Sequence, residues 1–256
     1  MRSIWIIAAK DLKNILMSPL FYVIAGLCSL LWSYSFMRAV LSFAERARVY
    51  MQPGMDTGMN LQREVFLSHI SMANLLFVFV VPALTMRLLA EEKRLRTYDL
   101  LLTSPVTATH IAVGKFLAGW GTVAVLTLIS LAYPLATRGL AEFPMGPLFS
   151  AYLGLLLVAG VYVAVGLFAS SLTESILLSV VMGLLFNILL WFLAQGAGGG
   201  ESSTWWSAAL EYMSVGQHFL NFIIGAIKLN SLVFFVSLMV LFVFLTQRVV
   251  ESSRWR

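Results

Sequence analysis

The chain has 256 residues, of which 60% are hydrophobic and 11% are charged, and its formal net charge is +5 at pH 7. A soluble globular domain contains roughly 25% charged residues, so this composition excludes a water-soluble enzyme, a disordered chain and a disulfide-rich secreted domain. It indicates a protein embedded in a lipid bilayer, with a single cysteine, Cys28, inside an apolar run.

Residues 1–18 predict an amphipathic helix that lies along the membrane surface. Apolar side chains recur at helical spacing on one side of this helix, and Lys10 and Asp11 fall on the other side. Pro19 marks the break before the first membrane span. The alternative is that the segment simply extends the first span into the cytoplasm.

Six apolar runs follow, each long enough to cross about 30 Å of hydrocarbon at 1.5 Å per residue. Because unpaired backbone groups cannot face lipid, and because the runs show no alternation of period two, they predict helices rather than barrel strands. The fold class is therefore an all-α integral membrane protein with six transmembrane helices. The predicted spans are residues 20–41, 70–89, 111–137, 148–170, 176–194 and 229–246.

The basic residues lie mostly beside the apolar runs, which indicates membrane orientation and contact with anionic lipid headgroups rather than nucleic acid. If the N-terminus is cytoplasmic, more basic residues fall on the cytoplasmic side than on the outer side. The cytoplasmic group includes Lys93, Arg94 and Lys115. Both termini are therefore predicted to be cytoplasmic.

Residues 90–110, the charged segment, form the most charged part of the chain and are predicted to be cytoplasmic. Thr97 is predicted to cap a short helix that has an apolar body around Leu100 and ends at Pro105. Thr107 is predicted to cap the helix of the third span. A short capped helix between two spans is typical of a rod that docks in a groove of a partner, and the alternative is an interfacial loop.

The outer connection, residues 195–228, begins with four glycines among its first six residues and continues with aromatic residues. Glycine-rich sequence indicates a flexible linker, and aromatic residues are enriched at membrane interfaces. We therefore expect the second half of this connection to lie in the outer interface or to re-enter the membrane.

Motifs for intrinsic catalysis are missing from the sequence. It contains no G-x-x-x-x-G-K-[ST] phosphate loop, no H-E-x-x-H zinc motif and no G-x-S-x-G nucleophile elbow, and His69, His110 and His218 fall on different segments. No carboxylate lies in the middle of a predicted span, which argues against an ion-coupled secondary transporter. Asn187 lies in mid-span and is expected to hydrogen-bond across a helix interface.

The charged segment resembles the permease subunits of ABC-2 type transporters, especially the gliding-motility and multicopper-linked branch. The family pattern E-E-[KR]-x-x-G-T-x-E-L-L-L-T-x-P-V corresponds to residues 91–106, with Arg96 in place of the usual glycine and Asp99 in place of the usual glutamate. Residues 214–219, followed by Gly225, are similar to the family's S-P-x-x-H-F…G-x-I stretch before the last span.

The resemblance implies the transmembrane permease subunit of an ATP-binding cassette exporter, in the bacterial inner membrane, as half of a homo- or heterodimer. A separate ABC ATPase subunit would bind and hydrolyse ATP, so the chain would be no enzyme and would hold no cofactor or metal. Two other functions stay open: a membrane anchor for a surface machine that moves no substrate, and a stand-alone secondary transporter. The lack of a charged site in mid-span favours amphiphiles, lipids, glycans or peptides over small ions as substrate.

The resemblance also implies roles for individual residues. The main ATPase-coupling element would contain Glu91, Glu92, Thr97, Asp99, Leu100, Leu101 and Pro105. A second contact on the inner side would contain Thr173 and Glu174. The re-entrant outer region would contain His218, Phe219 and Gly225.

Overall fold

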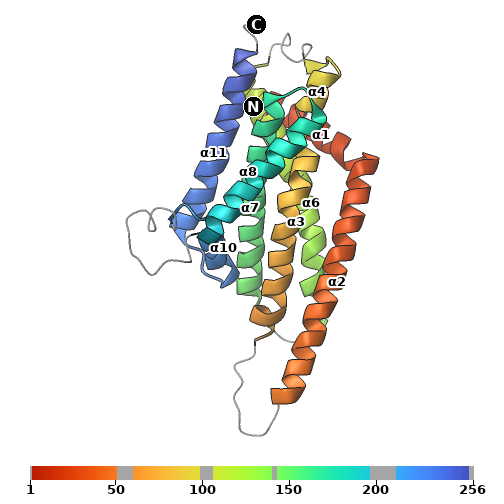
Figure 1. The fold of residues 1–256 in the computed structure, drawn as a ribbon, viewed down its shortest axis with the longest axis vertical. Coiled ribbons are helices and arrows are strands. Elements are labelled where there is room, and N and C mark those ends of the chain that lie inside the picture. The colour runs from red at the N-terminus through yellow and green to blue at the C-terminus, as the bar shows by residue number, and fades with distance from the viewer. Residues whose placement is uncertain (1, 51–59, 99–105, 140–142, 197–211, 254–256) are drawn as a thin grey trace.

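The computed structural model describes residues 2–50, 60–98, 106–139, 143–196 and 212–253, and these residues form helices joined by turns (Figure 1). Most helices run along the long axis of the molecule. The N- and C-terminal ends of the chain lie at the same end of the bundle as α4. The elements are α1 (Arg2–Leu16), α2 (Pro19–Tyr50), the π-helical η1 (Gln62–Phe66), α3 (Leu67–Thr85), α4 (Ala90–Arg94), α6 (Ala108–Ala136), η2 (Thr137–Gly139), α7 (Met145–Leu172), α8 (Ile176–Gly196), α10 (Val215–Ile223) and α11 (Leu229–Ser252).

The described residues include five helical stretches that are long and apolar enough to cross a membrane. They lie in α2, in η1 through α4, in α6 with η2, in α7 and in α11. A shorter apolar helix within α8 runs from Ile176 to Phe192. The prediction of an all-helical membrane protein is confirmed, while the count of six spans and the cytoplasmic position of the termini stay predictions.

Helix α7 lies at the centre of the bundle. It packs against α3, α6, α8, α10 and α11, and 83% of its most apolar stretch is buried, against 17% for α2. Gly154, Gly160 and Gly166 follow one another at six-residue intervals, which places them on three different faces of the helix. Their small size lets three neighbouring helices approach closely. The side chains that occupy the space are Phe222 of α10 at Gly154, Met239 of α11 at Gly160 and Thr85 of α3 at Gly166.

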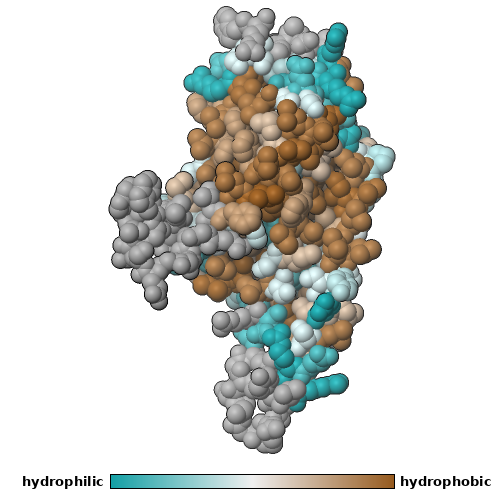
Figure 2. Space-filling view, in the orientation of Figure 1, coloured by the Kyte–Doolittle hydropathy of each residue, from teal (hydrophilic) through white to brown (hydrophobic). Residues whose placement is uncertain are grey.

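The outer surface of the bundle is apolar over its middle. Figure 2 shows a broad hydrophobic band between hydrophilic regions at the two ends of the molecule. Large apolar side chains are exposed on α2, α8 and α11, among them Leu30, Leu185 and Val240. A continuous apolar belt of this kind would be unstable in water, and it matches the hydrocarbon core of a membrane.

Helix α1 packs against α6 and is separated from α2 by a turn. A Cβ atom at Gly114 of α6 would lie 2.9 Å from the Ile7 side chain, so the two helices approach closely at this point. The Ser18 hydroxyl accepts the Phe21 amide at 3.3 Å, and Pro19 is the first residue of α2. The break predicted at Pro19 is therefore confirmed.

A break interrupts the predicted second span, residues 70–89, within a longer apolar stretch that continues through α4. α3 ends at Thr85, and residues 86–89 form a turn before α4. Pro82, in the last turn of α3, has no N–H and removes one hydrogen bond from the helix. Beyond the end of α3, the Met86 carbonyl accepts the Ser170 hydroxyl of α7 at 3.2 Å and the Glu91 amide at 3.4 Å.

Two further local expectations have opposite outcomes. Thr107 caps α6 as predicted, because its hydroxyl accepts the amide of His110 at 3.3 Å. The prediction that Asn187 hydrogen-bonds across a helix interface is wrong. This side chain is fully buried in α8, and within the described residues neither its amide nitrogen nor its amide oxygen has a hydrogen-bond partner.

Candidate functional site

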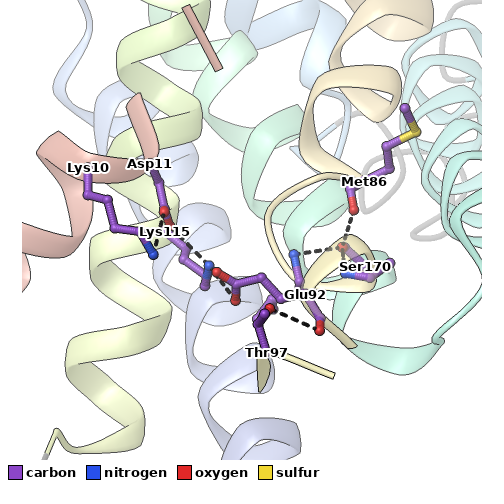
Figure 3. A network of polar contacts seen from close by, with 9 residues as sticks. Lys10, Asp11, Met86, Glu92, Thr97, Lys115 and Ser170 are labelled. Carbon is purple, nitrogen blue, oxygen red and sulfur yellow. Dashed lines mark hydrogen bonds and ion pairs between the residues drawn. The ribbon is translucent and has the colours of Figure 1, made fainter. Parts of the chain in front are cut away.

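The charged segment begins with α4, a helix of five residues whose N-terminus is fixed by α7. The buried Ser170 hydroxyl accepts the amide of Ala90 at 2.9 Å and that of Leu89 at 3.3 Å, and it donates to the Met86 carbonyl (Figure 3). One side chain therefore satisfies groups on both sides of the break between α3 and α4. A short helix could not supply these partners itself.

Lys93 connects α4 to the turn between α7 and α8. Its ammonium group donates to the Ser171 carbonyl at 2.5 Å and lies 5.2 Å from the centre of the Tyr98 ring. The Glu174 carboxylate acts electrostatically on Lys93, and the neighbouring Thr173 hydroxyl accepts the amide of Ser175. The structure thus places the predicted second inner contact, Thr173 and Glu174, beside the first.

A buried lysine joins α1, α4 and α6. Lys115 of α6 is 1% exposed, and its Nζ atom lies 3.0 Å from Asp11 Oδ2 of α1 and 2.8 Å from Glu92 Oε2 of α4. Figure 3 shows the lysine between the two carboxylates. A buried charge is tolerated only when it is paired, so each of the three groups depends on the others. We call Asp11, Lys115 and Glu92 the charge triad.

Sequence reasoning placed Lys115 among the cytoplasmic basic residues and Asp11 on the polar face of the surface helix, and both are buried instead. The sequence did contain a signal for burial of this lysine. Lys115 stands alone among apolar residues, seven positions after the first residue of its membrane helix. Such a charge needs a partner. The partner lies 104 residues away in the sequence, so helical spacing alone could not identify it.

The residues predicted to contact an ATPase divide into two groups. Glu91 pairs with Arg87 at 2.9 Å, Glu92 belongs to the charge triad, and the Thr97 hydroxyl donates to the Glu92 carbonyl at 3.3 Å. The other four, Asp99, Leu100, Leu101 and Pro105, lie outside the described residues.

A groove of about 630 Å³ lies between α1 and α4. Its lining carries both signs of charge, from Lys10 and Asp11 on one side and Arg87, Glu91 and Glu92 on the other. This groove is the concave surface beside the charge triad. A protein segment with charges of both signs would complement it.

Just after the C-terminus of α4, Arg96 occupies a left-handed backbone conformation that favours glycine. Arg96 has φ of +57°, its amide donates to the Lys93 carbonyl, and the Thr97 amide donates to the Glu92 carbonyl. This pair of bonds is the Schellman motif, whose left-handed position is usually glycine. The departure from the family pattern at Arg96 therefore falls on the one left-handed non-glycine residue of the described chain.

Replacing Arg96 with glycine is expected to stabilise the end of α4 by about 1 kcal/mol, because a side chain in the left-handed region is strained. Hydrogen exchange at the Arg96 and Thr97 amides measures the effect, and both should exchange more slowly. The control is Arg94→Gly, two residues earlier at the last residue of α4, where the backbone is right-handed and glycine costs up to about 1 kcal/mol, so exchange should become faster. Faster exchange in both variants would contradict the assignment.

The predicted outer region is a compact junction between α10 and α11. The His218 ring nitrogens lie 2.9 Å from the Ser231 hydroxyl and 3.0 Å from the Tyr212 carbonyl, and the ring stacks on Phe234 with centres 4.2 Å apart. The Asn221 amide also donates to Ser231. His218 therefore fixes the position of α10 relative to α11.

Phe219 and Gly225 belong to the same junction. Phe219 is buried, and Gly225 ends α10 with φ of +89°, in a second Schellman motif formed by the amides of Gly225 and Ala226. A Cβ atom at Gly225 would lie 3.2 Å from Pro147. Both the left-handed backbone and the close approach to α7 explain glycine at this position.

Metal ligands do not gather anywhere in the described ranges, where no group of three or more His, Cys, Asp or Glu side chains occurs. Cys28 is a buried free thiol in α2. The polar atoms of the charged end are instead taken up by ion pairs and hydrogen bonds between helices.

The model of one protein family, described as ABC-2 family transporter protein, matches residues 57–250. The match covers more than half of the chain and includes α4, Lys115 and the α10–α11 junction. A comparison with curated proteins finds no match to this chain.

Proposed function

The chain belongs to the ABC-2 family of transporter proteins, and from this we propose that it is the permease subunit of an ATP-binding cassette exporter of the gliding-motility and multicopper-linked branch. In this family the membrane component works with a separate ATPase subunit. The chain would receive movement from that subunit through the charged segment and pass it to the membrane helices.

The observation that carries the proposal is the charge triad. A push on α4 reaches α6, a helix of 29 residues, through Glu92 and Lys115, and it reaches α1 through Asp11. α4 also follows α3 directly in the chain, across the break held by Ser170. Displacement of one short helix would therefore move three longer ones together, as expected of a two-state transporter biased by its partner.

The groove between α1 and α4 supports a docking surface for the ATPase at this end of the bundle. Glu91 lines the groove and is only partly buried, so its pair with Arg87 is accessible to a partner. Lys115 does not line the groove, and its ion pairs with Asp11 and Glu92 hold the two walls together. We assign Thr173 and Glu174 to the same surface, because Lys93 connects their turn to α4.

The proposal also covers the membrane topology and the surfaces that face lipid and a second chain. α8 would be the sixth span, both termini would be cytoplasmic, and α10 would be a re-entrant helix on the outer side. The exposed apolar faces of α2, α8 and α11 are available to lipid and to a second permease chain. The membrane would be the bacterial inner membrane.

Charge reversal at Asp99 is expected to reduce co-purification of the ATPase by about tenfold, since a charge facing its own sign across an interface costs more than 1.4 kcal/mol. The chain is expressed with its ATPase, purified in detergent, and scored for bound ATPase and for ATP-driven transport. The matched control is Glu45→Lys, the same charge change on exposed α2 away from α4, which should leave both readouts unchanged. Unchanged coupling in Asp99→Lys would remove this residue from the mechanism.

The same complex separates the rival functions. An exporter stops when the ATPase subunit is made inactive, whereas an anchor for a surface machine keeps working. A secondary transporter would move substrate in vesicles without any ATPase, driven by an ion gradient. The absence of carboxylates from the middle of the apolar runs gives no site for such a gradient to act on.

A further inference from the structure

A cavity of about 610 Å³ opens in the side of the bundle, in the half of the molecule away from α4. It lies between α2, α3, α7, α8 and α10. Among the described residues that line it there is no Asp, Glu, Lys or Arg. The polar residues of its lining are all uncharged: Ser35, Ser68, Ser71, Asn74, Tyr162 and Gln217.

Two polar atoms of this lining have no hydrogen-bond partner. The Tyr162 side chain is fully buried, and its hydroxyl, like the Asn74 Oδ1 atom, has no partner of good geometry in the described chain. The two side chains interact with each other, but their contact falls outside good hydrogen-bond geometry, and a hydroxyl and an amide oxygen each have capacity for a further bond. Buried polar groups are normally paired, so these two indicate a place for a ligand.

The remainder of the lining is apolar and aromatic, including Trp191, Phe219 and Leu220. An ionic headgroup would be buried here without a counter-charge, which is strongly unfavourable. A purely apolar molecule would leave the hydroxyl of Tyr162 and the amide of Asn74 unpaired. Only a molecule with uncharged hydrogen-bonding groups and an apolar body satisfies the whole lining.

We propose that this cavity binds an amphiphile with an uncharged polyol headgroup, such as a sugar, whose hydroxyls bond to Tyr162 and Asn74. The aromatic rings of Trp191 and Phe219 supply apolar surface for the headgroup's carbon face, and the alkyl chain extends toward the membrane. The inference rests on the proposed function in one respect, that this ligand is the substrate of the transporter.

The test measures access to the cavity in the full-length chain embedded in lipid nanodiscs. Met72 lines the cavity, so the chain carries Met72→Cys in a Cys28→Ala background and is labelled with an uncharged maleimide. Three probes with the same ten-carbon chain are compared: decyl maltoside, decyl sulfate and decyltrimethylammonium. We expect decyl maltoside to slow labelling at concentrations at which the two ionic probes do not.

The variants Tyr162→Phe and Asn74→Leu each remove one hydrogen-bonding group from the cavity. Each is expected to weaken protection by decyl maltoside about fivefold, the usual value of one hydrogen bond. Ser150→Ala is the matched control, because Ser150 is also buried on α7 with an unpartnered hydroxyl but does not line the cavity. It should be protected like the parent chain.

Several results would overturn the proposal. Equal protection by all three probes would show that only the alkyl chain binds, and an absence of labelling without any probe would show that the cavity is closed. Labelling that is blocked in nanodiscs holding two copies, but free in those holding one, would show that a second copy of the chain covers this surface. Since the experiment contains neither ATP nor an ATPase, its outcome is independent of whether Asp99→Lys uncouples the transporter.

Discussion

Lys115→Met is expected to destabilise the chain by about 3–5 kcal/mol, the usual cost of removing one partner from a buried ion pair. The substitution keeps the length of the side chain but leaves Asp11 and Glu92 facing each other without the cation that separates them. The free energy of unfolding is measured in mixed micelles by denaturant titration. ATPase activity of the complex should lose its dependence on the permease in the same variant.

Two controls separate charge from packing at this position. Lys228→Met makes the same substitution at an exposed residue just before α11, and its unfolding free energy should change by about 0.5 kcal/mol or less. The triple variant Asp11→Asn, Glu92→Gln and Lys115→Met removes the unbalanced charges and should recover most of the loss. A single Lys115→Met variant as stable as the parent would show that the charge triad carries no stability.

Gly166→Val is expected to destabilise the bundle by about 3 kcal/mol through overpacking. A Cβ atom at Gly166 would lie 2.3 Å from the Thr85 hydroxyl, and the Gly166 Cα lies near Gly183 of α8, where an added Cβ would sit 3.7 Å away. α7 would therefore have to move away from the end of α3. Because Thr85 is the last residue of α3 before the break and α4, ATPase coupling should weaken along with stability.

The control for this variant is Gly26→Val in α2, where an added Cβ meets no atom within 4 Å. It should be neutral, because it removes the same helical glycine without creating a contact. Thr85→Ala removes the hydroxyl that blocks the site, so Gly166→Ala should cost less in that background than alone. An equal cost in both backgrounds would assign the loss to backbone flexibility instead of packing.

The sequence predicted the helices better than the contacts between them. Apolar runs of about 20 residues identify membrane helices directly, because the medium imposes their length and their hydrogen bonding. Local signals were also sufficient at Pro19 and Thr107, where the residue that ends or caps a helix is adjacent to it. Pro82 is a local sign of the end of α3 that the prediction of one span over residues 70–89 did not use, and the partner that holds this end lies on another helix.

The site residues that escaped prediction act across long sequence separations. The Ser170 hydroxyl caps a helix 80 residues earlier in the chain, and a serine at the end of an apolar run carries no local sign of that role. Helical spacing placed Asp11 on the polar face of the surface helix, yet its partner is the buried Lys115 of α6. The left-handed backbone at Arg96 was marked only by the glycine of the family pattern at that position.

The central position of α7 has a consequence for the order in which the protein is made. A chain that is synthesised from its N-terminus delivers α3 and α6 to the bilayer before α7, the helix against which both pack, exists. Asp11 and Glu92 both precede Lys115, so the lysine reaches the membrane with its two counter-ions already made. When α7 arrives, Gly166 meets Thr85 of α3, which is already made, while Gly154 and Gly160 are left to receive α10 and α11, which follow α7 in the chain.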